Sequence, residues 1–281
     1  MSATKFIVSF VLAVVLLSAY AYGSDKVEDF PSNPVLKRIL QRGELVVGTT
    51  GKQPPLNGMD KAGKVIGLEA DLARLLADAL GVRVDFQTMP FSELLPALEA
   101  GRLDMVISGM TITPKRNSKV AFVGSYFVSG KSFVTKAQTI ASVKEASEIN
   151  RPEVVLAAMK GSTSQAFVER LLPKVKLMLT EDHQEALELV LQNKVHAMVA
   201  DHHVCVLCVF LFPEEKLVTL ERPLTYEPFG IALPGNDPLL INLVENFLGT
   251  LQGSGDLEKL KERWFKEGFW GKETLHDAIQ Y

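Results

Sequence analysis

The feature that most constrains the fold is a local pattern that occurs twice. Residues 97–107 and 189–199 each combine a helix end, a break with a basic residue, and an apolar strand. The break is at Gly101 in the first segment and at Asn193 in the second. A chain that repeats one helix-to-strand unit in both halves is expected to build two similar α/β lobes.

The segments around these repeats complete two sets of alternating strands and helices. Expected strands are 44–49, 82–86, 104–109, 154–158 and 175–179, and expected helices are 35–41, 67–80, 92–100, 162–171 and 238–265, the last with a break at Gly253 and Gly255. The chain is expected to cross between lobes near 129–135 and to return near 226–233. The predicted fold is therefore α/β, with two Rossmann-like lobes joined by a two-strand hinge.

The length and charge of the chain limit what it can be. At 281 residues with 47% hydrophobic and 22% charged residues, it suits two packed domains. We assign lobe 1 to residues 35–130 and 231–281, and lobe 2 to residues 131–230. A net charge of −3 lacks the basic excess that binds phosphate backbones, which excludes nucleic acid as a partner.

The first 23 residues have the features of a secretory signal peptide. Lys5 precedes an apolar run at 6–17, and Ala19-Tyr20-Ala21 fits a signal-peptidase site. That run is only about 12 residues, shorter than the roughly 20 that span a bilayer. We predict that residues 1–23 are cleaved and that the mature protein is free in an exported compartment, because no cysteine lies near the cleavage site to carry a lipid anchor.

The two cysteines, Cys205 and Cys208, lie in an apolar stretch, 204–212. We expect both to be buried thiols in the core. A disulfide, or a metal site completed by His202 and His203, is the less favoured alternative, because neither fits a C-x-x-C pair inside a regular element. We predict no metal and no cofactor.

The ends of the predicted strands carry small and hydroxyl residues that suit a polar ligand. They are Thr49-Thr50-Gly51, Ser108-Gly109-Met110-Thr111, Gly161-Ser162-Thr163-Ser164 and Ala200-Asp201. Arg116 follows the second group, and its guanidinium can bind a carboxylate through two hydrogen bonds. Asp201, in the other lobe, can accept from an ammonium group. Alone, Arg116 could be a solvated helix-start residue and Asp201 a cap; together they favour an α-amino acid receptor.

Residues 36–265 resemble the bacterial extracellular solute-binding proteins of family 3, the periplasmic amino-acid receptors of ABC importers. The most specific likeness is the run from Ser108 to Arg116, followed by Val120-Ala121-Phe122 and Ser125-Tyr126-Phe127. Further matching blocks are 67–73, 160–164 and 226–232. The resemblance implies the type II fold of periplasmic binding proteins.

The same resemblance implies a role for several side chains. Arg116, Thr111 and Thr163 would bind the α-carboxylate of the ligand. The Gly109 carbonyl and the Asp201 carboxylate would receive its ammonium group.

The ligand side chain would face residues that partly depart from the family pattern. Phe91 would form an aromatic wall against it. Gln53 stands where the family has an aromatic residue, and Thr50 stands where some relatives have an acid for a cationic side chain. These departures favour a polar ligand of modest size.

The implied function is capture of a free amino acid by a monomer in the periplasm and its delivery to a membrane ABC permease. The alternative is a periplasmic cyclohexadienyl (arogenate/prephenate) dehydratase, which the segments 36–40 and 49–51 also resemble. Val204 stands where those enzymes have their acidic glutamate, and an alkyl group cannot donate a proton. A sensor or transglycosylase fusion would need a further domain, which we do not expect.

Overall fold

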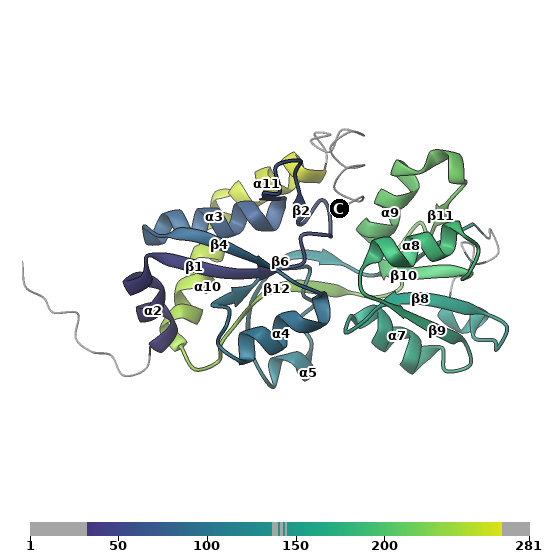
Figure 1. Cartoon of the computed structure of the whole chain (residues 1–281), viewed down its shortest axis with the longest axis horizontal. Coiled ribbons are helices and arrows are strands. Elements are labelled where there is room, and N and C mark those ends of the chain that lie inside the picture. The colour runs from purple at the N-terminus through teal and green to yellow at the C-terminus, as the bar shows by residue number, and fades with distance from the viewer. Residues whose placement is uncertain (1–32, 137–139, 141–142, 144, 266–281) are drawn as a thin grey trace, which may run out of the picture.

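The computed structural model describes residues 33–136, 140, 143 and 145–265, which form two α/β lobes side by side (Figure 1). The predicted signal peptide, 1–23, lies outside the described residues. Within the described part of the chain, no helix is both long and apolar enough to cross a membrane.

The first lobe is built on a five-stranded mixed sheet. In spatial order its strands are β4 (Arg83–Thr88), β1 (Glu44–Thr49), β5 (Met105–Val106), β12 (Glu227–Leu233) and β6 (Ala121–Ser129). Its helices are α2 (Pro34–Arg42), α3 (Leu68–Leu80), α4 (Phe91–Glu99), α5 (Pro114–Asn117), α10 (Pro238–Ser254) and α11 (Asp256–Phe265), and β2 (Gly58–Met59) pairs with β3 (Val65–Ile66) at one side. Strands β4, β1 and β5 are parallel, whereas β12 is antiparallel to both of its neighbours.

The second lobe repeats this plan with a second five-stranded sheet. Its strands, in spatial order, are β11 (Val218–Thr219), β7 (Lys131–Thr135), β10 (Ala197–Asp201), β8 (Val155–Met159) and β9 (Lys176–Thr180). Its α-helices are α7 (Thr163–Leu171), α8 (His183–Leu191) and α9 (His202–Leu211), and the short 3₁₀ turns are η1 (Ala146–Ile149) and η2 (Pro213–Glu215). Helix α7 covers one face of the sheet, and α8 and α9 cover the other (Figure 1).

The strands pack because successive side chains point to opposite faces of each sheet. In β1, Leu45 and Val47 join the core under α3 and α10, whereas Val46 joins the core under α4. Burial on both faces explains why β1 is an almost uninterrupted apolar run. Each lobe therefore has a core on both sides of its sheet.

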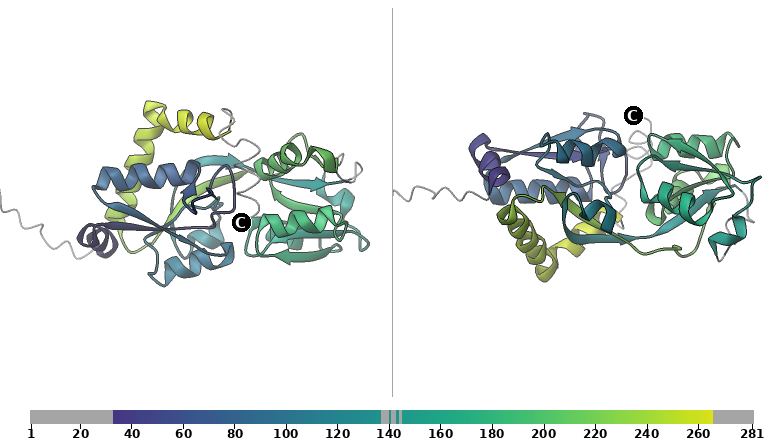
Figure 2. Two further views of the ribbon diagram at one scale, coloured as in Figure 1. Left: turned by 45° about the horizontal axis from the view of Figure 1, so that its top comes forward. Right: turned by 90° about the horizontal axis from the view of Figure 1, so that it is seen from below.

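Two segments connect the lobes (Figure 2). Gly130 separates β6 in the first sheet from β7 in the second, within the predicted first crossing. The chain returns before Glu227, which already pairs with Ser129 in the first sheet. The lobe boundaries at 130 and 230 stay predictions.

Most expected elements form within a few residues of their predicted bounds, with two local differences. The predicted strand 104–109 is regular only as β5 (Met105–Val106), and the residues after it bond irregularly within the first lobe, Ile107 to Gly48 and Ile112 to Pro228. The helix expected at 92–100 begins one residue earlier, at Phe91 after Pro90, and has no side-chain cap.

The predicted burial of the two cysteines is confirmed. Cys205 and Cys208 lie on α9, both are buried, and both thiols are free. Burial raises the pKa of the Cys208 thiol to about 12. Among the described residues, no three His, Cys, Asp or Glu side chains are grouped to hold a metal ion.

Candidate functional site

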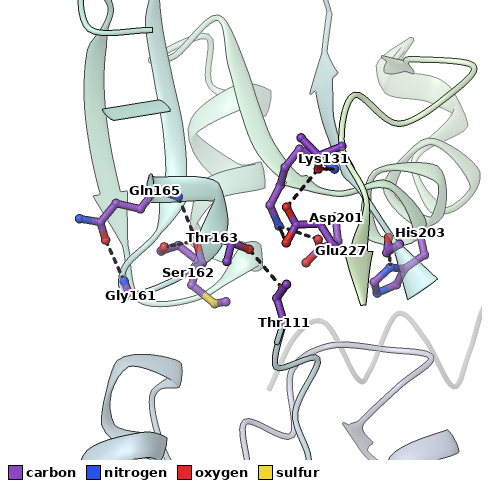
Figure 3. Close-up of polar contacts among 12 residues, drawn as sticks. Thr111, Lys131, Gly161, Ser162, Thr163, Gln165, Asp201, His203 and Glu227 are labelled. Carbon is purple, nitrogen blue, oxygen red and sulfur yellow. Dashed lines mark hydrogen bonds and ion pairs between the residues drawn. The ribbon is translucent and has the colours of Figure 1, made fainter. Parts of the chain in front are cut away.

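The two lobes meet at residues that the sequence analysis selected. Thr111 Oγ1, from the first lobe, lies 3.3 Å from Thr163 Oγ1 of the second lobe (Figure 3). Arg116 donates from Nη1 to the Thr111 carbonyl at 2.8 Å and from Nη2 to the Gly161 carbonyl at 3.1 Å. Three of the predicted ligand contacts, Thr111, Arg116 and Thr163, are thus brought together across the interface.

Local sequence explains how Arg116 is placed. Thr113 caps the single turn α5, accepting from the Arg116 backbone N–H at 3.2 Å, and Pro114 occupies the first helical position. The guanidinium carbon lies 5.5 Å from the centre of the Phe91 ring, so the predicted aromatic wall contacts the arginine. The side chain is thereby oriented by backbone carbonyls and one ring.

The opposite wall is the turn that opens α7. Gly161 has a φ of 74°, and a Cβ at this position would lie 3.1 Å from Ser92 of the first lobe. Ser162 caps α7, its hydroxyl accepting from the Gln165 N–H at 3.2 Å (Figure 3). A glycine is therefore required here both by the left-handed backbone and by the close approach of the other lobe.

Asp201, at the end of β10, already has a cationic partner within the chain. Lys131 lies directly opposite it on β7, and its Nζ is 2.6 Å from Asp201 Oδ1 and 3.7 Å from Glu227 Oε2 (Figure 3). Burial raises the pKa of Asp201, but Lys131 and His203 lower it more, so that the net shift is downward. Asp201 is therefore ionised at neutral pH.

Arg116 interacts electrostatically with two carboxylates, those of Asp201 and Glu227. Burial lowers its pKa to about 10, against the opposing effect of Asp201 and Glu227, which raise it. The guanidinium stays protonated at neutral pH. A cation from the first lobe and a carboxylate from the second therefore interact electrostatically.

Gln53 and Gly109 lie against each other in the first lobe. Gln53 is buried, and a Cβ on Gly109, whose φ is 55°, would lie only 2.7 Å from Gln53 Oε1. The Gly109 N–H donates to Glu69 Oε1 at 2.6 Å, and Tyr126 donates to the same oxygen at 2.5 Å. Burial raises the pKa of Glu69, against three hydrogen bonds that lower it.

Thr50 is held on the first-lobe side of the interface. Its hydroxyl donates to Asn57 Oδ1 at 2.9 Å, and its backbone N–H donates to Ser108 Oγ at 3.0 Å. It borders a cavity of about 450 Å³ that also contacts Met59 and Thr88. The structure therefore does not bring Thr50 to the cavity that Arg116 lines.

Two further cavities border the interface. The larger, of about 850 Å³, is lined by Thr111, Arg116, Thr163 and Glu227 among others. A small one of about 40 Å³ lies between Gln53 and helices α8 and α9, where Val204 and His183 line it. Thr111, Arg116 and Thr163 thus line the larger cavity, whereas Gln53 and Thr50 line two others. None of these three cavities is lined by Phe91, Gly109 or Asp201.

Sequence reasoning missed Lys131, Glu227, Glu69 and His183. For Lys131 the sequence offered one signal, a charged residue directly after Gly130 in the predicted crossing. The structure buries all five residues of β7, so this lysine needs a charged partner. The matching register of Lys131 with Asp201 was not visible, since it depends on how distant strands pair.

Val204 is buried on α9 and has no proton to donate, but His183 borders the same cavity. Its Nδ1 has no hydrogen-bond partner, and burial lowers its pKa, against Asp201, which raises it. His183 is therefore neutral at pH 7 and could accept a hydrogen bond from a ligand.

Comparison with known proteins agrees with this architecture. The family model of bacterial extracellular solute-binding proteins, family 3, matches residues 45–267. The chain is 24% identical to the L-cystine-binding protein TcyJ of Escherichia coli (strain K12) over 91% of this chain and 93% of that one. It is 26% identical to cyclohexadienyl dehydratase of Pseudomonas aeruginosa over 82% and 86%.

A solved structure is more similar. It is the ancestral amino acid-binding protein AncCDT-1, described as a precursor of cyclohexadienyl dehydratase, at 36% identity and a TM-score of 0.75 over 82% of this chain and 99% of that one. Its fold is that of the type II periplasmic amino-acid-binding proteins, and the two lobes described above match it. The chain belongs to the bacterial extracellular solute-binding proteins, family 3.

Proposed function

We propose that the protein is a periplasmic receptor that captures an amino acid between its lobes and delivers it to an ABC permease. The observation that carries this proposal is that Arg116, from the first lobe, bonds the second lobe at Gly161 and interacts electrostatically with Asp201 of that lobe. Opposite charges on the two lobes complement the carboxylate and the ammonium of an amino acid. The curated relatives and the ancestral structure add support, because their names describe amino-acid binding.

In this receptor the α-carboxylate binds to Arg116 and to hydroxyls of both lobes. Arg116 supplies two N–H groups in one plane, and the hydroxyls of Thr111 and Thr163 donate to the remaining carboxylate lone pairs. The carbonyls that Arg116 contacts in the structure release it as the carboxylate enters.

The ammonium group binds at the lobe-2 side. Asp201 has a second carboxylate oxygen besides the one that Lys131 contacts, and a carboxylate accepts on both. The Gly109 carbonyl is the other proposed acceptor. Phe91 is proposed to face the side chain of the ligand, whereas Gln53 and Thr50 border other cavities than Arg116 in this arrangement of the lobes.

A screen of free amino acids tests the proposal. The purified protein is titrated calorimetrically with each proteinogenic amino acid, and melting temperature is recorded in parallel. A ligand at 100 times its dissociation constant stabilises the folded state by about 2.7 kcal/mol, which a melting curve resolves. Binding of none of them would contradict the amino-acid assignment.

The dehydratase alternative has its own observation, since one curated relative carries that name. Val204 cannot protonate a leaving hydroxyl, and the neighbouring His183 is uncharged at pH 7, so it has no imidazolium proton to give. We predict that arogenate and prephenate yield no phenylalanine or phenylpyruvate above background. Formation of either product that depends on the protein, measured by chromatography, would contradict the receptor proposal and show that the protein is an enzyme.

A further inference from the structure

Helix α9 keeps two apolar side chains in solvent. Val206 is 45% exposed and Phe210 is 62% exposed, and their spacing of four residues puts them on one face of the helix. In the other helices of the described residues, large exposed apolar side chains occur singly, which is ordinary for a protein surface. Val206 and Phe210, called the α9 stripe below, therefore form a contact surface that the described residues leave uncovered.

The other apolar residues of α9 already have partners. Cys205 and Cys208 belong to the second-lobe core, whereas Leu207 and Leu211 pack against the first-lobe core. Because successive residues are about 100° apart around a helix, the α9 stripe borders the face that carries Leu207 and Leu211. An occupant of the stripe would therefore lie beside the boundary between the lobes.

The described part of the first lobe ends beside the same helix. The ring of Phe265, the last residue of α11, stacks on Phe127 with ring centres 4.8 Å apart. The Phe265 ring also lies 6.3 Å from the ring of His203, which is on α9. Figure 1 shows α11 ending on the side of the first lobe that faces α9. The chain therefore leaves the described residues next to the α9 stripe.

The sequence that follows, residues 266–281, contains apolar side chains that could cover the α9 stripe. The first of them are Phe269 and Trp270. An extended chain spans at most about 3.6 Å per residue, so Phe269 is within about 14 Å of Phe265. Phe210 is only about 10 Å along α9 from His203, because a helix rises about 1.5 Å per residue. Both aromatic residues are therefore within reach of the stripe.

A segment of the same chain fits this surface better than a second protein does. Two exposed side chains bury far less than the roughly 800 Å² per partner of a standard stable interface. A tethered segment needs no such area, because its tether keeps it near the surface at an effective concentration of about the millimolar range. The size of the stripe thus favours an occupant from the chain itself.

We propose that residues 266–281 dock on the α9 stripe, with Phe269 and Trp270 against Val206 and Phe210. The segment starts in the first lobe, and α9 belongs to the second lobe. The docked segment is therefore a third connection between the lobes, and it stabilises the arrangement in which α11 ends beside α9. This inference does not rest on the proposed receptor function.

Quenching of tryptophan fluorescence by acrylamide tests the docking in the full chain. The protein has two tryptophans, and Trp264 is only 3% exposed, so changes in quenching report on Trp270. In wild type, Trp270 should be shielded. Replacing both stripe residues, Val206→Ser with Phe210→Ser, should lower the docking equilibrium constant at least about tenfold, because it removes apolar area that docking buries, and quenching should rise.

A matched double variant controls for the loss of apolar surface. Met178 and Leu179, on β9 of the same lobe, are 40% and 45% exposed. Met178→Ser with Leu179→Ser should therefore be quenched like wild type. Circular dichroism checks that both double variants are folded.

A disulfide trap locates the contact directly. Val206→Cys with Phe269→Cys should cross-link within one chain under mild oxidation, whereas Met178→Cys with Phe269→Cys should not. The native Cys205 and Cys208 should stay reduced, because both are buried and burial raises the pKa of each thiol.

Several results would overturn the proposal. They are wild-type quenching equal to that of the stripe variant, the same cross-linking yield for both cysteine pairs, and shielding of Trp270 that is lost on dilution as a dimer dissociates. The last result, followed by light scattering, would mean that a second copy of the chain covers the α9 stripe. None of these measurements uses an amino acid, so their failure would leave the receptor function standing, and a failed amino-acid screen would leave the docking standing.

Discussion

At the scale of single residues, the site depends on groups that satisfy one another before a ligand is bound. Arg116 donates to two carbonyls, and Asp201 accepts from Lys131. Such internal partners keep charges paired in a partly buried cleft, where an unpaired charge is unfavourable. The ligand therefore replaces some of these internal contacts with contacts to itself. Its affinity reflects the free energy of the new contacts minus that of the contacts they replace.

Truncating either end of the proposed zwitterion site should weaken binding strongly. Arg116→Ala and Asp201→Ala each leave a ligand charge without its partner, a loss of about 2–5 kcal/mol, or roughly 30-fold to several thousand-fold. Titration calorimetry measures this, with Arg170→Ala as a control because Arg170 borders the same cavity but is exposed. Affinities within about threefold of wild type for both variants would contradict the amino-acid assignment. If Asp201→Ala leaves the affinity unchanged but Arg116→Ala weakens it, the ligand is a carboxylate without an ammonium group.

The stability of these two variants should differ. Arg116→Ala removes a side chain whose contacts are to carbonyls and one ring, so little change in melting temperature is expected. Asp201→Ala leaves the buried Lys131 with Glu227 alone, and breaking a buried pair typically costs about 3–5 kcal/mol. Affinities are therefore compared well below the melting temperature of Asp201→Ala.

At the scale of elements, sequence periodicity predicted which segments are regular but not every register. The helix 67–80 was predictable because Leu68, Leu72 and Leu76 recur on one face and Gly81 ends it. Helix α9 was not assigned as helix or strand, because it is apolar on all sides. The pairing of β7 with β10, which places Lys131 against Asp201, depends on packing between segments far apart in sequence.

Helix α9 also places a histidine against the hinge, which predicts a pH dependence. His203 contacts the rings of Phe127, Phe229 and Phe265, and Ser129 Oγ is 3.1 Å from its Nδ1. Burial lowers its pKa from 6.5 to about 4, so the folded state keeps it neutral while the unfolded state gains a proton below pH 6.5. Stability should therefore fall as pH drops through the window from 6.5 to about 4.

The His203→Phe variant isolates this contribution. Wild type should lose on the order of 2 kcal/mol more than His203→Phe between pH 7 and pH 5, measured by urea unfolding at each pH. Burial also lowers the pKa of His202, but this neighbouring side chain is less buried, so His202→Gln should flatten the pH profile less than His203→Phe does. Parallel pH profiles for wild type and His203→Phe would show that His203 titrates normally in the folded protein.

At the scale of the whole molecule, the repeated helix-to-strand pattern was enough to predict two lobes and their crossings. The contacts between lobes could not be predicted, because they join residues that no local pattern relates. Thr111 meets Thr163, Gly161 approaches Ser92, and Lys52 pairs with Asp182. These contacts belong to a closed arrangement in which the two lobes touch directly.

A two-lobe receptor should change shape when it binds its ligand. Two crossing segments allow rigid-body opening, and a ligand that contacts both lobes stabilises the closed form by its differential affinity. The radius of gyration from small-angle scattering should therefore decrease on saturation with the ligand found in the screen. Gly161→Val should reduce that decrease, because a side chain at φ 74° would strain the turn and contact Ser92, whereas Gly235→Ala, with open space around it, should behave as wild type. An identical scattering profile with and without ligand, at concentrations where calorimetry shows saturation, would mean that capture proceeds without closure of the lobes.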